Sequence, residues 1–368
     1  MSALAIFLLF SVGGQGQTRS LEPSWSLTLD DPRPIILGAW SPASTCVAAA
    51  TDAAVHVVDT AGHLLWKWNF REATHLNRLG SLAVSPACDA VVVGGDVDHK
   101  FVWIARHRRG HTSFRTRGTP RAVKFSLRGD LVAVATGASL GYLLSDKGEV
   151  RWSGKLDDLP ITWAHEARTP STTSRTEFAK DDVEAIRLAL NWWPAAYDVR
   201  RSDDGSWRIE RETPFRGSGT EIIQLWGPGD KAPRWRKAIG CADILISGDG
   251  EFVMTSGDVE HSEYGAGGNP PCDRVAVHVF DHDGRDVRSW PLTQLGSFIG
   301  LTPDGRGFLY AVGDSIERRD LTGEISWTIF SYGGSLSPDR RLLLELAPIE
   351  RPANDPRPTI RMFQLPDR

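Results

Sequence analysis

The sequence predicts an all-β fold, a seven-bladed β-propeller made of four-stranded antiparallel blades. Three observations predict it. A cassette of short strands and turns recurs with a period of about 35 to 55 residues. Glycine, proline and aspartate separate apolar runs of strand length, and the two ends of the chain resemble complementary parts of one unit.

The repeating unit is clearest over residues 301–330. Four short runs lie there between turn signals at 303–305, 313–314 and 320–323. Strands of this length punctuated by Gly, Pro and Asp are typical of an antiparallel four-stranded meander.

The first turn of this unit recurs as a hydroxyl residue followed by turn-forming residues and an apolar run. The copies begin at Ser41, Ser85, Ser126, Ser247, Thr302 and Ser337. A second signature, an Asp, then a Gly, then a Trp, marks four units. Its members are Asp59, Gly62 and Trp66; Asp146, Gly148 and Trp152; Asp281, Gly284 and Trp290; and Asp320, Gly323 and Trp327.

Most units carry a tryptophan in the predicted fourth strand. These residues are Trp25, Trp66 or Trp68, Trp152, Trp235, Trp290 and Trp327. A large flat ring at a fixed place fills the wedge between adjacent twisted sheets. We therefore interpret them as packing residues rather than as a cofactor cage.

One further unit is expected between residues 126 and 247, with its third and fourth strands at 221–226 and 234–236. This unit carries an insertion over about residues 166–219. Apolar residues at helical spacing predict a helix over 176–193, with a strand over 186–190 as the alternative. Asp203-Asp204-Gly205 predicts a hairpin over 197–212.

The two chain ends are predicted to complete one blade. The last unit stops after a third strand at 359–365, and residues 24–29 resemble the fourth strand at 326–329. Pairing these ends closes the ring and removes its exposed inner edge. A single propeller domain is therefore expected over residues 21–368.

Composition indicates an ordinary globular protein of 368 residues, 41% hydrophobic and 24% charged. The net charge of −4 argues against nucleic-acid binding, which usually needs a basic face. We interpret the cationic run 106–109 as a solvated loop rather than a patch for an anionic partner. A monomer is expected.

Residues 1–16 are predicted to be a secretory signal peptide. Ala3–Val12 is an apolar run too short to span a bilayer, and Gly14 and Gly16 place small residues before a cleavage site after Gly16. The alternative is an unprocessed apolar tail. We expect export to the periplasm or the extracellular space, and no transmembrane segment.

The four cysteines are Cys46, Cys88, Cys241 and Cys272, and none forms a C-x-x-C pair. In an exported protein the expected disulfide joins Cys241 to Cys272, because Cys272 lies in a long loop rich in Gly and Pro. Buried free thiols are the alternative.

The cassette S-P-D-G, an apolar strand and then D-x-x-G-x-x-x-W resembles the bacterial WD40-like and quinoprotein-like (PQQ-like) propellers. The resemblance covers nearly the whole mature chain except residues 166–219. It implies the fold; blades of this kind serve scaffolds, sensors and enzymes alike. Quinoprotein dehydrogenases of this class carry an adjacent Cys-Cys pair, which this chain lacks, so no redox cofactor is expected.

Two similar loops are candidate metal or acid–base sites. They carry Asp96, Asp98 and His99 in the second unit, and Asp258, Glu260 and His261 in the fifth. If they face each other across one end of the ring, they could hold a divalent cation or act as acid and base. Ordinary turn chemistry is the alternative, because Gly313-Asp314 shows the same dipeptide without the histidine.

A ligand or partner face is predicted at the same end. Its candidate residues are His75, Asn77, His261, Glu263, Tyr264 and Asn269, with Trp192 and Trp193 at an apolar tip of the insertion. We expect an exported, non-catalytic propeller that binds a protein or another macromolecule. The alternative is a hydrolase or lyase with a metal or His/carboxylate site at the channel mouth.

Overall fold

The computed structural model describes residues 19–74, 79–95, 100–138, 140–155, 197–202, 206–212, 220–258, 276–292, 296–302, 305, 307–331, 334–347 and 357–366. Every element in these ranges is a β-strand, except the one-turn helix α1 (Phe70–Thr74). Among the described residues there is no helix long and apolar enough to cross a membrane.

Five sheets are separate antiparallel units, apart from one added parallel strand. Sheet I contains β3 (Leu37–Trp40), β4 (Cys46–Ala50), β5 (Val55–Asp59) and β6 (Leu64–Trp68). Sheet II contains β7 (Leu79–Val84), β8 (Ala90–Gly95), β9 (Phe101–Arg106) and β10 (Gly110–Arg115). Sheet III contains β11 (Pro120–Phe125), β12 (Leu131–Thr136), β13 (Leu140–Ser145) and β14 (Val150–Lys155).

Sheet VI, which is the predicted 301–330 unit, contains β22 (Ser297–Leu301), β23 (Gly307–Val312), β24 (Ser315–Asp320) and β25 (Ile325–Phe330). The parallel strand β1 (Arg19–Ser20) lies on its outer edge. Sheet VII contains β26 (Ser335–Leu336), β27 (Leu342–Ala347), β28 (Thr359–Gln364) and β2 (Trp25–Thr28).

The remaining sheet has seven strands and divides into two four-stranded halves that share one strand, β18. Its strands are β15 (Tyr197–Arg201), β16 (Arg208–Glu212), β17 (Thr220–Trp226), β18 (Trp235–Ile246), β19 (Phe252–Asp258), β20 (Ala276–Asp281) and β21 (Asp286–Pro291). The long β18 pairs with β17 up to Gly240 and with β19 mainly from Asp243 onward, with a register shift between. We name the halves sheet IV (β15 to β18) and sheet V (β18 to β21).

The predicted hairpin over 197–212 forms, but its place differs from the prediction. Its strands β15 and β16 continue the sheet by pairing with β17, so they are the first two strands of sheet IV rather than part of an insertion. The predicted helix over 176–193 lies outside the described residues.

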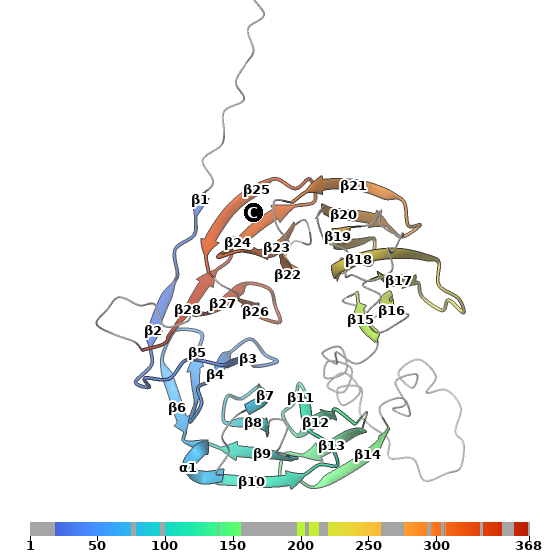
Figure 1. Cartoon of the computed structure of the whole chain (residues 1–368). Helices are drawn as coiled ribbons and strands as arrows, with labels where there is room; N and C mark the ends of the chain where they lie inside the picture. The colour runs from blue at the N-terminus through green and yellow to red at the C-terminus, as the bar shows by residue number, and fades with distance from the viewer. Residues whose placement is uncertain are drawn as a thin grey trace, which may run out of the picture.

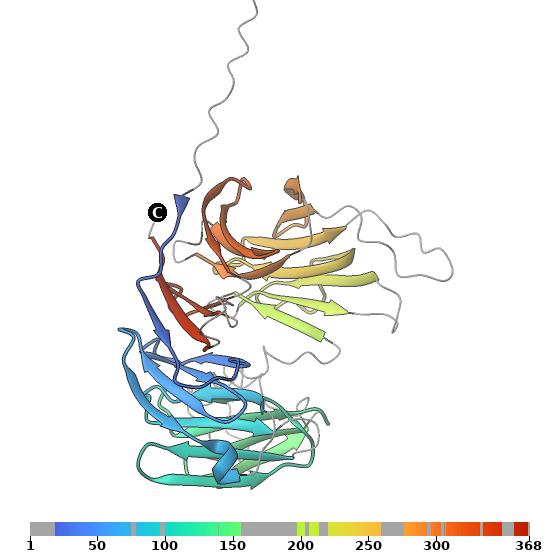
Figure 2. The same cartoon turned by 60° about the vertical axis from the view of Figure 1, so that its left-hand side comes forward.

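The sheets are arranged around a common centre (Figure 1; Figure 2 shows a view turned by 60°). In sheets I, II, III, VI and VII the first antiparallel strand lies nearest this centre and the fourth farthest from it (Figure 1). Apolar clusters join sheet IV to V, V to VI, VI to VII, VII to I, I to II and II to III. Because successive side chains of a strand point to opposite faces, one strand serves two neighbours. On β5, Val57 packs toward sheet II and Val58 toward sheet VII.

The repeated hydroxyl residue of the first turn is a buried structural group. In sheet III the amide of Leu131 donates to the Ser126 hydroxyl at 3.2 Å, and the Leu131 carbonyl accepts from the Ser126 amide at 3.0 Å. The fourth turn residue is left-handed, with φ of 78° at Gly129. The same buried hydroxyl recurs in all seven sheets as Ser41, Ser85, Ser126, Ser202, Ser247, Thr302 and Ser337.

The tryptophans of the outer strands pack on the next sheet, as predicted. A Cβ atom added at Gly62, in the β5–β6 turn, would lie 2.9 Å from Cδ2 of Trp25 on β2. Gly284 stands in the same relation to Trp235, and Gly323 to Trp290. Glycine is therefore required in these turns both for its positive φ and for the space that the indole ring occupies.

The two chain ends meet in sheet VII. Strand β2 pairs antiparallel with β28, in the register Trp25 to Met362. The Ser24 amide donates to the Met362 carbonyl at 2.7 Å, and the Leu29 amide donates to the Pro358 carbonyl at 3.0 Å. The residues before β2 continue along the edge of sheet VI as β1, so the N-terminal segment borders two neighbouring sheets.

A disulfide joins Cys46, the first residue of β4, to Cys88 in the first turn of sheet II, with a Cα–Cα distance of 6.1 Å. This bond links two adjacent sheets and was not predicted. The sequence analysis expected either a Cys241–Cys272 disulfide or free thiols, and for Cys46 and Cys88 the expectation of free thiols is wrong. The predicted Cys241–Cys272 pair lies outside the side chains that the structure describes.

We predict that Gly62→Ala lowers the free energy of unfolding by about 2–4 kcal/mol, from positive-φ strain plus the clash with Trp25. Gly110→Ala is the matched control. Gly110 also has a positive φ, of 78°, but nothing lies within 4 Å of its added Cβ. It should lose only about 1 kcal/mol. Equal losses in urea unfolding would contradict the packing of Trp25 on Gly62.

Candidate functional site

The two ends of the assembly differ in how the strands are connected. We call upper the end that carries the connections from each second to third strand and from one sheet to the next. The lower end carries the first-to-second and third-to-fourth turns, which are short and hydrogen-bonded. Upper-end connections vary in length, but the three longest gaps between consecutive described strands, residues 156–196, 259–275 and 348–358, all lie at this end.

Nearly all the predicted site residues lie outside the described residues. These are His75, Asn77, Asp96, Asp98, His99, Trp192, Trp193, Glu260, His261, Glu263, Tyr264 and Asn269. Asp258 is the last residue of β19, where its backbone pairs with Gly240, and its side chain is not described. The two candidate loops do connect second to third strands, in sheets II and V. Their metal or acid–base chemistry stays a prediction.

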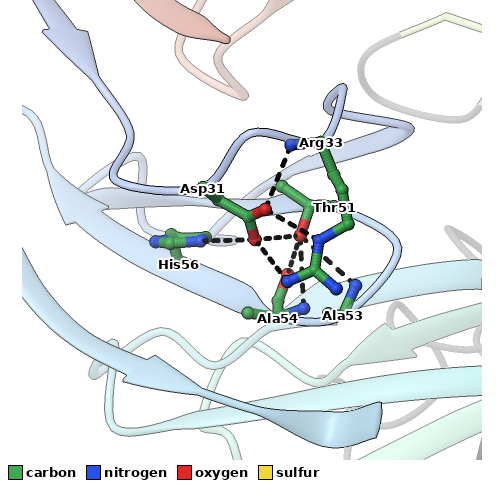
Figure 3. A network of polar contacts seen from close by, with 6 residues as sticks. All are labelled: Asp31, Arg33, Thr51, Ala53, Ala54 and His56. Carbon is green, nitrogen blue, oxygen red and sulfur yellow. Dashed lines mark hydrogen bonds and ion pairs between the residues drawn. The ribbon is translucent and has the colours of Figure 1, made fainter. Parts of the chain in front are cut away.

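Across the described part of the chain, no three His, Cys, Asp or Glu side chains are grouped so as to hold a metal ion. A concentrated polar network is nevertheless present at the upper end of sheet I (Figure 3). Asp31 and Arg33 come from the connection between β2 and β3, Thr51 follows β4, and His56 is on β5.

Asp31 is the centre of this network. Its carboxylate accepts hydrogen bonds from Arg33 Nε at 2.8 Å and from the Thr51 hydroxyl at 2.8 Å. The residue is 2% exposed. Burial alone would raise the pKa of the Asp31 carboxyl, but the hydrogen bonds from Arg33 and Thr51 outweigh it and hold this pKa below its ordinary value. The carboxylate is therefore ionised and fully used as an acceptor.

Thr51 joins the carboxylate to the tight connection between β4 and β5. Its hydroxyl accepts from the amides of Ala53 and Ala54 at 3.3 and 3.2 Å, while it donates to Asp31 (Figure 3). The whole Thr51 residue, including this hydroxyl, is 0% exposed. It is thus committed to holding the loop, and its proton is directed at a carboxylate rather than at a site that a substrate could reach.

His56 is buried beside this network with neither ring nitrogen hydrogen-bonded to a described residue. Its Nε2 lies 4.0 Å from Asp31 Oδ2. Burial, and to a smaller extent Lys67, lowers the pKa of His56 to about 4. The imidazole is therefore neutral at neutral pH, and on β5 it lies on the face that packs against sheet VII.

The network has a structural role. It fixes the chain where it passes from β2, the last strand of sheet VII, to β3, the first strand of sheet I. Sequence reasoning missed these four residues, because each is unremarkable in its own segment and only the tertiary structure brings them together.

No protein-family model and no curated protein matches this sequence. Among solved structures 1459 chains match, so the similarity in shape points to no single activity. One is a chain in the crystal structure of a mitotic checkpoint complex, 12% identical over 99% of both chains with a TM-score of 0.49. That score is too low to carry an argument, and the fold assignment rests on the strand pairings above.

We predict that the free energy of unfolding falls by about 3 kcal/mol as the pH is lowered from about 6.5 to about 4. Over this window the unfolded His56 binds a proton that the folded one does not, so protonation favours unfolding. Asp31 contributes mainly below this window, because the stability from its lowered pKa is lost as the pH falls through its ordinary value of 3.8.

His56→Leu should remove most of this pH dependence, whereas His111→Leu, at another exposed histidine, should leave it unchanged. The measurement is urea unfolding at several pH values. The same slope in the wild type and in His56→Leu would show that His56 is not the group responsible.

Proposed function

We propose that this chain is an exported, seven-bladed β-propeller of the WD40-like or quinoprotein-like type. Its proposed role is to bind a protein or another macromolecular partner without catalysis. Support for seven blades comes from the seven buried hydroxyl turns and from the division of the long sheet at the register shift in β18. Support for a closed ring comes from the pairing of β2 with β28.

The contrast between the two ends is the observation that carries the proposed role. Lower-end connections are brief turns with their own hydrogen bonds, such as the one at Ser126–Gly129. The long connections all leave and re-enter the sheets at the upper end. Binding residues are found disproportionately on loops that a rigid scaffold positions. A partner is therefore proposed to bind at the upper end.

Export is supported by two independent features. Residues 1–16 have the apolar run and small residues of a secretory signal. Disulfides persist mainly in oxidising compartments, and Cys46 and Cys88 form one between adjacent sheets. A periplasmic or extracellular location is consistent with both.

The test is site-specific photo-crosslinking in the source organism. A photoreactive residue is placed at the exposed upper-end positions Ala138 and Asp314, and at the exposed lower-end positions Lys147 and Asp283. We expect discrete protein adducts from the upper positions only, because the partner contacts that end. Adducts are identified by mass spectrometry.

Crosslinks that form equally from both ends would overturn the assignment of the binding face. If no discrete adduct forms from either upper position, while the variants are exported and folded, the macromolecular partner itself is contradicted. Each variant is compared with the wild type in urea unfolding, so that loss of structure is not mistaken for loss of binding.

A further inference from the structure

The charge of this protein is distributed very unevenly along the chain. Residues 99–129 contain nine Lys and Arg and no Asp or Glu. The rest of the chain therefore has 33 of the 42 cationic residues and all 46 acidic ones, a net charge of −13. The overall value of −4 hides this separation.

The cations of this stretch divide between the two ends of sheets II and III. At the lower end Arg106 forms an ion pair with Asp146 at 3.0 Å, and Arg128 lies 3.8 Å from Asp130. Charge there is partly neutralised, in keeping with the interpretation of 106–109 as a solvated loop.

Four cations gather at the upper end instead, and we call them the upper basic cluster: Lys100, Arg115, Arg117 and Arg121. All four are exposed, and none of them forms an ion pair with a carboxylate that the structure describes. Lys100 immediately precedes β9, the third strand of sheet II, and Arg115 ends β10. Arg117 lies in the connection to sheet III, and Arg121 is the second residue of β11.

The backbone that carries this cluster is held in place by hydrogen bonds. The Thr116 amide donates to the Lys100 carbonyl at 2.8 Å, and the Arg117 amide donates to the Tyr142 hydroxyl at 2.9 Å. The Gly137 amide donates to the Thr119 carbonyl at 2.9 Å. Tyr142 is itself buried, with its ring 5.2 Å from that of Phe114. A preorganised set of cations loses less entropy on binding than a flexible one.

We propose that the upper basic cluster is a docking surface for a short acidic segment of a partner protein. The inference rests on the proposed function and names the chemistry of the partner at that face. Guanidinium groups pair well with carboxylates, which matches the three arginines. The cluster is small and the rest of the chain carries net charge −13, so an extended polyanion such as nucleic acid would be repelled along most of its length.

The test uses the full-length mature protein and a fluorescently labelled peptide of about twelve residues with Glu at alternate positions. Its binding is followed by fluorescence anisotropy at about 50 mM and at about 500 mM salt. We expect binding that weakens with salt, and no binding of the same peptide with Gln in place of Glu.

The triple variant Arg115→Gln/Arg117→Gln/Arg121→Gln should weaken binding roughly tenfold or more. The matched control is Arg109→Gln/Arg151→Gln/Arg285→Gln, which makes the same change in net charge at exposed positions away from the cluster. The control should bind the Glu peptide like the wild type. An equal loss in both triple variants would mean that net charge alone attracts the peptide, and would overturn the site.

Two further outcomes also contradict the inference. One is tighter binding of single-stranded DNA, heparin or anionic lipid vesicles than of the Glu peptide, because that would assign the cluster to another class of polyanion. The other is absence of Glu-peptide binding by the folded wild type. In that case the photo-crosslinking test is repeated in the triple variant. If the upper-end crosslinks persist there, the proposed function holds but the upper basic cluster is not its binding site.

Discussion

The pairing of β2 with β28 is the constraint on which the rest of the structure depends. Sheets I to V each take their strands from one stretch of chain, and sheet VI gains only the two-residue strand β1 from the N-terminal segment. Sheet VII, in contrast, takes the outer strand of its antiparallel four from the opposite end of the chain. Two further features occur at the same seam: Trp25 of β2 packs on Gly62 of sheet I, and the connection that follows β2 is held by Asp31, Arg33 and Thr51. Hydrogen bonding, aromatic packing and a buried carboxylate thus act together where the chain begins and ends. The proposed ring of sheets needs one such joint, because a sheet in a ring buries both faces against its neighbours.

Many of the contacts that stabilise the scaffold lie in the strands and the lower-end turns rather than in the long upper-end connections. The lower-end turns are fixed by their own buried hydroxyls, and the inter-sheet clusters bury the strands. Long connections, and cations that form no ion pair with a described carboxylate, can then be placed at the upper end with little cost to the core. The upper basic cluster fits this division, because Tyr142 and the backbone hold the segment 115–121 while its arginines face outward. A rigid body with a variable end is suited to recognition.

The parts of this fold that repeat could be predicted from sequence, and the parts that occur once could not. The hydroxyl turn and the tryptophan at a fixed place in the fourth strand are local patterns, and so is the likeness of residues 24–29 to a fourth strand. The glycine on which each tryptophan packs became known only from the structure. Ser202 fits the turn pattern but was assigned to an insertion, because the strands beside it are rich in charge rather than apolar. Asp31 and His56 meet only through tertiary structure, and the Cys46–Cys88 bond joins neighbouring units whose contact no local pattern encodes.

The upper basic cluster shows in the sequence as a stretch without acidic residues, but the overall charge of −4 obscured it.

Amide hydrogen exchange of the intact protein tests the joint most directly. The informative amides are those of Ser24 and Leu29, which donate to carbonyls beside and within β28, together with the paired amides of β2 itself. If β2 completes sheet VII, the amides of residues 24–29 that are hydrogen-bonded to the β28 segment should exchange as slowly as those of β4 and β5 in the interior of sheet I. Rapid exchange of residues 24–29 beside a protected sheet I would show that the chain end is not built into the sheet, and the account of a closed ring would fail.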